Sequence, residues 1–198
     1  MMELILASAS PRRQALLREL GIGFIAMPQD VDESPLPDEA PESLVKRLSL
    51  AKARAALAGL SEGDHRPVLG SDTIVVCDQQ ILGKPENKSQ GLAMLRLLAN
   101  RKHQVMTAVA LMNHDQEFQA MSITAVTFKP LSDSEIEAYW DSGEPADKAG
   151  AYALQGLGAM FVSEIHGSYS GVVGLPIFET VALLENFGLG SKAILQNQ

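Results

Sequence analysis

The N-terminal third of the chain alternates between short apolar runs and helical stripes. The apolar run at 3–8 predicts a short buried strand, and the run at 24–27 predicts a second strand. A leucine stripe between them predicts a helix that is capped by Ser10, has Pro11 in its first turn and stops at Gly21. Strand, helix and strand therefore follow one another closely.

The next segment is predicted as a loop, a helix and a strand. Residues 28–40 contain three prolines and five acidic residues, which is typical of an irregular acidic loop. Pro41 begins a predicted amphipathic helix that extends to about Leu57. The apolar run 67–76 predicts a strand with a break at Gly70, after which a turn at 78–80 reverses the chain.

The second half combines a hairpin with further helices. Ser132 and Glu135 have capping-box spacing at a helix start. The predicted elements are a helix at 88–99, strands at 104–112 and 117–128, a helix from 132 to 140, a glycine-bearing loop at 143–158, a strand at 159–165 and a last helix from Pro176 to Gly188. Mixed βα units and hairpins predict an α/β fold with a mixed sheet. No repeat or linker is present, so one domain is expected.

Composition excludes several classes of protein. Of 198 residues, 46% are hydrophobic and 20% are charged, which is typical of an ordered globular chain. No apolar run is long enough for a membrane helix. The first residues contain no basic segment followed by a secretory apolar region. We therefore expect no membrane partner and a cytoplasmic location.

Charge and cysteine usage narrow the partners further. Sixteen basic and 24 acidic residues give a net charge of −8, so nucleic acid is not an expected partner. Cys77 is the only cysteine, which excludes an internal disulfide and a cysteine zinc site. It lies in an apolar run and is expected in the core. The four histidines are scattered without metal-ligand spacing.

A first group of polar residues lies at the first strand-to-helix junction. Ser8, Ser10, Arg12 and Arg13 coincide with a predicted helix N-terminus, where free N–H groups and the helix dipole favour anions. Arginine can also donate two hydrogen bonds to phosphate oxygens. The group predicts a phosphate site. The alternative is a serine cap with two solvated arginines.

A second group is Gly70-Ser71-Asp72-Thr73, inside an apolar strand. An unpaired carboxylate at Asp72 would be costly to bury. Asp72 is therefore expected to be paired, bound to metal or exposed at a break in the strand. A turn aspartate is an equally good interpretation of the local pattern.

The remaining polar candidates are weak when taken singly. Lys52 lies on the second predicted helix, Lys84 precedes a proline, and Glu33 lies in the acidic loop. Gln155 lies in a glycine-bearing segment, and its amide offers a donor and an acceptor to a base edge. Solvated charges and a surface loop are the alternatives. No P-loop, dinucleotide-binding or nucleophile-elbow motif is present.

Taken in order, the motifs resemble those of the Maf family of nucleoside triphosphate pyrophosphatases. They are S-x-S-P-R-R, G-S-D-T, G-K-P, D-K-A-G-A-Y-x-x-Q-G and V-G-L-P, and they extend from Ser8 to Pro176. The resemblance implies a single domain over 1–198 with a mixed twisted sheet, flanking helices and two lobes around a cleft, related to inosine triphosphate pyrophosphatases. It also implies a divalent metal, Mg²⁺ or Mn²⁺, and suggests a homodimer.

The segment A-G-A-Y-A-L-Q-G resembles the dTTP/UTP branch of the family, whereas the 7-methyl-GTP branch has glutamate at the position of Gln155. By this resemblance Asp72 is the proton acceptor, and Arg12, Thr73 and Gln155 determine specificity. The residues that match positions around the substrate are Ser8, Arg13, Glu33, Lys52 and Lys84. The C-terminal segment SKAILQNQ matches no motif.

The resemblance implies a reaction that converts dTTP and UTP to the monophosphate and pyrophosphate and so removes non-standard or excess nucleotides. Arginine and lysine side chains would neutralise the triphosphate, Lys52 and Lys84 among them. Asp72 and Glu33 would hold the metal or orient the water, two roles that the sequence does not separate. Two alternatives stay open: a non-catalytic nucleotide-binding regulator of septum formation, and a phosphatase that releases orthophosphate.

Overall fold

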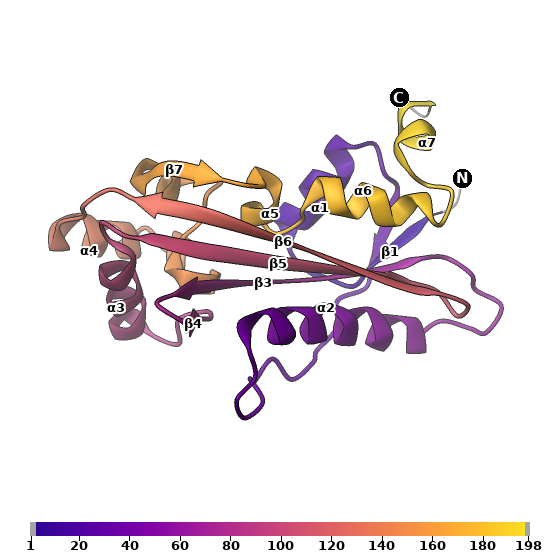
Figure 1. Cartoon of the computed structure of the whole chain (residues 1–198), viewed down its shortest axis with the longest axis horizontal. Coiled ribbons are helices and arrows are strands. Elements are labelled where there is room, and N and C mark those ends of the chain that lie inside the picture. The colour runs from indigo at the N-terminus through magenta and orange to yellow at the C-terminus, as the bar shows by residue number, and fades with distance from the viewer. Residues whose placement is uncertain (1–2, 197–198) are drawn as a thin grey trace. The chain divides into compact units, whose positions relative to one another are not determined.

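The structure is a computed structural model that describes residues 3–196, whose strands form one seven-stranded sheet in the order β2-β1-β3-β5-β6-β7, with β4 paired to β3 (Figure 1). The strands are β1 (Leu4–Leu6), β2 (Phe24–Ala26), β3 (Val68–Cys77), β4 (Gln80–Leu82), β5 (Lys102–Met112), β6 (Glu117–Phe128) and β7 (Val162–His166). β1 runs parallel to β2 and β3, whereas β4 is antiparallel to β3 and β7 to β6. The predicted mixed sheet is confirmed.

The helices begin largely where the sequence signals predict. They are α1 (Pro11–Glu19), α2 (Pro41–Ala58), α3 (Lys88–Leu98), α4 (Asp133–Asp141), α5 (Tyr169–Val173), α6 (Ile177–Glu185) and α7 (Ser191–Gln196). The Ser10 side chain caps α1 by accepting from the Arg13 N–H. The capping box of Ser132 and Glu135 at the start of α4 is present in full.

The predicted break in β3 at Gly70 is wrong, because the strand is continuous from Val68 to Cys77. Gly70 meets a packing requirement instead. A Cβ at this position would lie 2.1 Å from the Ser49 carbonyl oxygen and 2.9 Å from the Ala53 Cβ, both on α2. The glycine therefore allows α2 to approach the strand closely.

The C-terminal third contains more helical structure than predicted. The loop 143–158 contains short 3-10 helices, η1 (Glu144–Asp147), η2 (Ala149–Ala151) and the start of η3 (Leu157–Phe161), so β7 begins later than expected. The helix α5 was not predicted, and α7 follows the helix expected to be last. α7 lies in the unassigned C-terminal segment, whose final two residues are outside the described range.

The described chain divides into two compact units. Unit 1 comprises residues 3–72, 107–122 and 174–196, and unit 2 comprises 73–106 and 123–173. Within unit 1, α2 lies on one side of the strands and α6 on the other (Figure 1). Its core includes a cluster of buried apolar side chains from α2 and the sheet: Ile5, Ala7, Ala53, Ala56, Val68, Ala110 and Met112.

Unit 2 has a core of its own that is rich in aromatic rings. Phe128, Tyr139, Tyr152 and Phe161 pack with residues of α3 and of the strands. Cys77 belongs to this core and is 1% exposed, as predicted. The single domain over 1–198 and the cleft between two lobes, which the resemblance implied, stay predictions.

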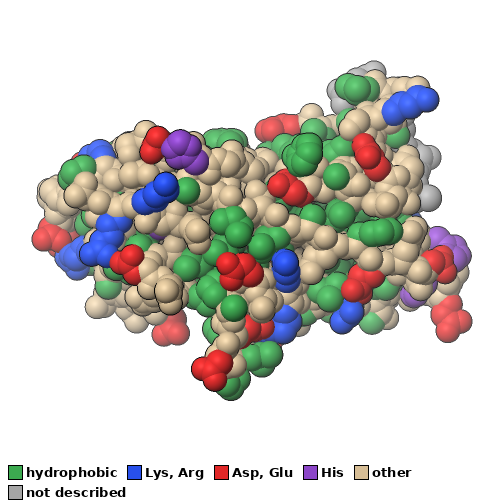
Figure 2. All heavy atoms as spheres, in the orientation of Figure 1, with side chains coloured by type: hydrophobic (Ala, Val, Ile, Leu, Met, Phe, Trp, Pro, Cys, Tyr) green, Lys and Arg blue, Asp and Glu red, His purple; other side chains and the backbone are tan. Residues whose placement is uncertain are grey.

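Acidic and basic side chains are interspersed on the face drawn in Figure 2. Several basic side chains of unit 2 form ion pairs with carboxylates, as Lys88 does with Asp141, Arg96 with Asp133 and Arg101 with Asp78. Among the described residues, no helix combines the length and apolar character needed to cross a membrane.

The core of unit 2 contains one buried histidine, His103 on β5, which is 2% exposed. Its Nε2 lies 2.9 Å from the Tyr152 hydroxyl, and its Nδ1 is buried without a hydrogen-bond partner. The rings of Phe128 and Tyr152 contact it edge-on. Burial lowers the pKa of His103 from 6.5 to about 4, so the folded protein keeps the ring neutral.

We predict that the unfolding free energy falls as the pH drops below 6.5, because the unfolded chain then protonates His103 while the folded chain does not. Between pH 7.5 and pH 5 this loss should be about 2 kcal/mol, and His103→Gln should remove most of it because glutamine accepts a hydrogen bond without titrating. Urea unfolding of the wild type and of His103→Gln at the two pH values measures this loss of unfolding free energy. An unchanged pH dependence in the variant would contradict the prediction.

Candidate active site

A buried lysine joins two carboxylates in unit 1. The Lys52 Nζ lies 2.6 Å from Asp72 Oδ1 and 2.6 Å from Glu33 Oε1. Lys52 is 9% exposed and Asp72 is 6% exposed, whereas the Glu33 side chain is 45% exposed. The cluster therefore has a buried end at Asp72 and an open end at Glu33.

The packing of α2 on β3 forms this cluster. Gly70 and Asp72 are two residues apart in β3, so they face the same side of the sheet. The missing side chain at Gly70 lets the backbone of α2 approach at Ser49 and Ala53. Ser49 lies three residues before Lys52, and Ala53 directly follows it. Lys52 consequently reaches Asp72 from the middle of the helix.

Asp72 is paired in the middle of a strand, so its interpretation as a turn aspartate is wrong. Burial raises the pKa of Asp72 above its ordinary value, and the charge and hydrogen bond of Lys52 offset part of this effect. A carboxylate that is desolvated but still paired is a stronger base than a solvated one. The Lys52 ammonium favours the ionised form of Asp72, which is the form that can accept a proton.

Arg13 is fixed by several hydrogen bonds at the start of α1. Its Nε donates to the Gly174 carbonyl at 2.8 Å, and its Nη1 donates to Ser8 Oγ at 3.2 Å. The hydroxyl of Ser71 also donates to the Gly174 carbonyl, at 3.0 Å. Burial lowers the pKa of Arg13, and the charge of Asp72 opposes that shift. Arg13 is therefore a fixed, half-buried cation, and the alternative of a solvated arginine is wrong for it.

Arg12 differs from its neighbour in having no partner among the residues that the structure describes. Its side chain is half-buried and forms no hydrogen bond or ion pair with any residue from 3 to 196. It lies in the first turn of α1, where the N–H groups and the helix dipole favour an anion. Arg13 is thus held in place by hydrogen bonds, whereas the Arg12 guanidinium is available to bind an anion.

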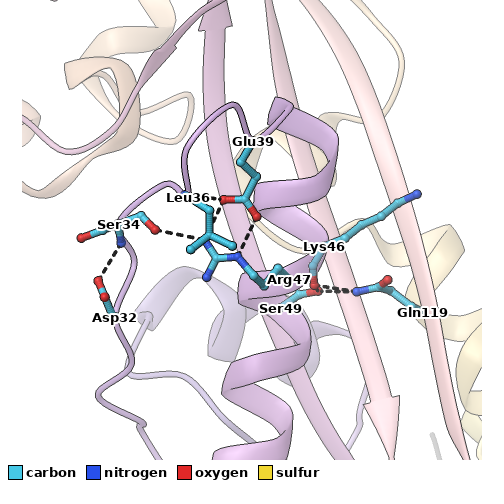
Figure 3. Close-up of polar contacts among 8 residues, drawn as sticks. All are labelled: Asp32, Ser34, Leu36, Glu39, Lys46, Arg47, Ser49 and Gln119. Atoms are coloured by element: carbon cyan, nitrogen blue, oxygen red, sulfur yellow. Dashed lines mark hydrogen bonds and ion pairs between the residues drawn. The ribbon is translucent and has the colours of Figure 1, made fainter.

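The acidic loop that carries Glu33 is fastened to α2 by Arg47 (Figure 3). Arg47 donates to both carboxylate oxygens of Glu39, at 2.7 and 2.8 Å, and to the Ser34 carbonyl at 3.0 Å. Glu39 also accepts from the Leu36 N–H, and Asp32 from the Ser34 N–H. The Arg47 hydrogen bonds lower the pKa of Glu39 to about 2. Arg47 is therefore anchored to the residue that follows Glu33.

Three of the predicted site residues belong to unit 2. Thr73 follows Asp72 directly and is half-buried, and Lys84 is exposed after β4. Gln155 is exposed between η2 and η3, and its side chain amide forms no hydrogen bond with the described residues. Within unit 1 the structure unites Glu33, Lys52 and Asp72. The remaining predicted residues of that unit, Ser8, Arg12 and Arg13, lie at the start of α1.

The donor set limits how a divalent metal could bind. Within 3–196, no group of three or more histidine, cysteine, aspartate or glutamate side chains could hold an ion. Asp72 and Glu33 do converge, since both lie 2.6 Å from one ammonium nitrogen. Two carboxylates fit Mg²⁺ or Mn²⁺ as hard oxygen ligands, provided that water or phosphate completes the coordination.

Sequence reasoning missed the residues that fix the site. Ser71 lies inside the G-S-D-T motif and Gly174 inside V-G-L-P, so motif membership was the available signal. Arg47 and Glu39 are eight residues apart and resemble ordinary surface charges. Their pairing depends on how the loop folds back, and no local pattern specifies that.

Comparison with known families agrees with the motifs. The model of the family described as Maf-like protein matches residues 3–187. The chain belongs to the Maf family. A curated relative from Vibrio parahaemolyticus, named dTTP/UTP pyrophosphatase, is 50% identical over 186 residues, covering 94% of this chain and 97% of the relative. Another of that name, from Pseudoalteromonas translucida, is 53% identical and covers 92% and 95%.

Among solved structures, this Maf chain matches one titled nucleoside-triphosphatase / dITP/XTP pyrophosphatase from Mycobacterium abscessus. The match has a TM-score of 0.46 and 14% identity, and it covers 94% of this chain and 96% of the other.

We predict that Arg47→Ala loosens the acidic loop, because three hydrogen bonds to the loop are lost. Amide hydrogen exchange at residues 32–39 should accelerate by about tenfold or more, while β3 stays protected. Arg54→Ala is the matched control, since Arg54 on the same helix pairs with Glu117 outside the loop. Equal exchange in the loop of both variants would show that Arg47 does not fasten it.

Proposed function

We propose that this Maf protein hydrolyses dTTP and UTP to the corresponding monophosphate and pyrophosphate. The observation that carries the proposal is the buried Asp72, paired with Lys52 at 2.6 Å, in a chain about half identical to named dTTP/UTP pyrophosphatases over nearly its full length. A buried carboxylate with a raised pKa and an adjacent ammonium is a suitable general base.

In the proposed reaction, Asp72 takes a proton from the attacking water. The water oxygen bonds to phosphorus as the α–β phosphoanhydride bond breaks, and pyrophosphate leaves with the electron pair of that bond. The Lys52 ammonium orients the Asp72 carboxylate and stabilises its charged form. Catalysis otherwise depends on neutralising the charge that develops on phosphate oxygens.

Neutralisation is assigned to the basic residues. Arg12 and Arg13 lie at the N-terminus of α1, where the positive end of the helix dipole adds to their charge. Ser8 fixes the orientation of Arg13. Lys84, in the G-K-P motif, is assigned to the same triphosphate, and Thr73 and Arg12 to discrimination among substrates, on the family resemblance.

Asp72 and Glu33 are the residues that we propose to hold a divalent cation, Mg²⁺ or Mn²⁺. When bound, the cation would supply positive charge to the phosphate oxygens. Lys52 and the cation would then both interact with the carboxylates of Asp72 and Glu33. Coordination would lower the basicity of Asp72, so its two proposed roles oppose each other.

Gln155 is assigned to the base. A uracil or thymine ring presents a carbonyl, an imide N–H and a second carbonyl along one edge. An amide can accept from that N–H and donate to a carbonyl, whereas a carboxylate can only accept. The exposed Gln155 amide has no internal partner among the described residues to compete with a base.

The finer attributes of the protein belong to the same proposal. We expect a cytoplasmic nucleotide enzyme that acts without nucleic acid or membrane as partners and forms a homodimer. The deciding assay incubates the protein with a panel of nucleoside triphosphates and Mn²⁺ or Mg²⁺ and identifies both products. Binding without turnover would favour a regulator of septum formation, and release of orthophosphate would favour a phosphatase.

We predict that Asp72→Asn lowers kcat by about 100-fold or more, the usual effect of removing a general base. The substitution keeps the shape of the side chain and removes its charge. Asp30→Asn is the control, because Asp30 is an exposed aspartate of the acidic loop. Steady-state rates of pyrophosphate release measure both. Near wild-type turnover of a folded Asp72→Asn protein would exclude Asp72 as the base.

We predict that the wild type turns over dTTP and UTP in preference to GTP and 7-methyl-GTP, and that Gln155→Glu erodes this preference. The carboxylate leaves a pyrimidine carbonyl unpaired, which costs about 1–3 kcal/mol, or about ten- to a hundredfold. Values of kcat/KM for the four triphosphates measure the ranking, with Gln104→Glu on β5 as an exposed control. An unchanged ranking would remove Gln155 from base recognition.

A further inference from the structure

The segment that carries Gln155 is bound by a carboxylate from the preceding short helix. Glu144 Oε2 accepts the Leu157 N–H at 2.9 Å, and Glu144 Oε1 accepts the Gly158 N–H at 2.9 Å. Both amides follow Gln155 in the chain. All of these residues lie within unit 2.

A buried tyrosine binds the other side of the same segment. The Tyr139 hydroxyl donates to Glu144 Oε1 at 2.7 Å and accepts the Ala153 N–H at 3.1 Å. Tyr139 is 4% exposed, and its ring packs edge-on against Phe161. Tyr139 and Glu144 therefore bind backbone N–H groups on both sides of Gln155. We call this pair the Glu144 latch.

Gly156 shows how closely the latch fits the segment. Its φ of 148° lies in a region that residues with a side chain rarely adopt. A Cβ at this position would lie 2.2 Å from Glu144 Oε2. The residue after Gln155 thus lacks a side chain at the point where the carboxylate binds the backbone.

The chemistry of Glu144 matches this arrangement. Burial raises its pKa, but the hydrogen bonds from Tyr139, Gly158 and Leu157 outweigh that effect, so the pKa is lowered overall. The ionised carboxylate accepts hydrogen bonds only, and every group that faces it is a donor. Gln155 in contrast has an exposed side chain without a hydrogen bond in the described chain. Its position therefore depends on the backbone.

We propose that Glu144 and Tyr139 are positioning residues for base recognition, because they fix the backbone from which Gln155 presents its amide. The inference rests on the proposed function, in which Gln155 recognises the pyrimidine edge. Neither residue needs to contact the substrate. Their loss should weaken the discrimination between bases more than it slows the chemical step.

Glu144→Gln is the sharpest test. Whichever way the glutamine amide turns, its NH₂ group faces the N–H of Leu157 or of Gly158, so one of the two bonds becomes a clash between donors. We expect the ratio of kcat/KM for dTTP over GTP to fall by about tenfold, through a higher KM for dTTP, while kcat changes by less than about threefold. Glu137→Gln is the control, an exposed glutamate on α4 that loses the same charge.

Two further variants keep the test decisive if Glu144→Gln folds poorly. Tyr139→Phe keeps the ring in the core and removes only the hydroxyl, and it should lower the same ratio. Gln155→Ala should lower the ratio by itself, and adding Tyr139→Phe to it should have no further effect on the ratio. The latch is supported if the ratio falls in Tyr139→Phe and in Gln155→Ala and falls no further when the two substitutions are combined.

The contrary outcomes separate the latch from the function on which it rests. If Gln155→Ala lowers the ratio but Glu144→Gln and Tyr139→Phe do not, the latch is refuted and base recognition by Gln155 stands. If the latch variants lose activity equally on all triphosphates, their role is structural and the latch is also refuted. If Gln155→Ala leaves the ratio unchanged, base recognition by Gln155 fails and the latch fails with it. Absence of pyrophosphate release by the wild type would refute the proposed function itself.

Discussion

The arrangement of unit 1 depends on one buried ammonium group between two carboxylates. Burial of Asp72 without a partner would be costly, and Lys52 at 2.6 Å is the group that makes its burial tolerable. Removing either charge would leave the other one buried and unpaired. The pair requires that the turn of α2 that carries Lys52 face β3, and the same ammonium also contacts Glu33 of the acidic loop.

Two different structural features, Gly70 and Arg47, position the groups around the pair of Lys52 and Asp72. Gly70 removes a side chain from β3, so that α2 can lie close enough for Lys52 to reach Asp72. Arg47 fastens the acidic loop through Glu39 and the Ser34 carbonyl, which limits where Glu33 can lie. One feature acts by packing and the other by charged hydrogen bonds. In both cases a residue outside the proposed chemistry determines the position of a residue within it.

Much of the fold was predictable because local signals and global structure agree. The Ser10 cap, the capping box of Ser132 and the hairpin after β3 are all set by a few neighbouring residues, and all are confirmed. The error at Gly70 has the opposite cause: its glycine serves a helix that lies about twenty residues away in sequence, so the local pattern suggested a break. The motifs identified Asp72 and Lys52 as candidates, but not that they bind each other. Long-range pairs such as Arg13 with Gly174 carry no local signal at all.

The charges of unit 1 give a physical reason for the proposed cation. Arg13 and Lys52 carry two positive charges, and Asp72 and Glu33 carry two negative ones, so this group is balanced as it stands. Arg12 is the remaining proposed phosphate ligand of the unit, and it has no ion pair within residues 3–196. Arg12 together with Lys84, the residue of unit 2 assigned to the same triphosphate, supplies fewer charges than a triphosphate carries, and two carboxylates of unit 1 would add to the repulsion. A divalent cation held by Asp72 and Glu33 would make the electrostatic interaction with the triphosphate attractive. The carboxylates would then hold a cation that binds the phosphate oxygens instead of repelling them.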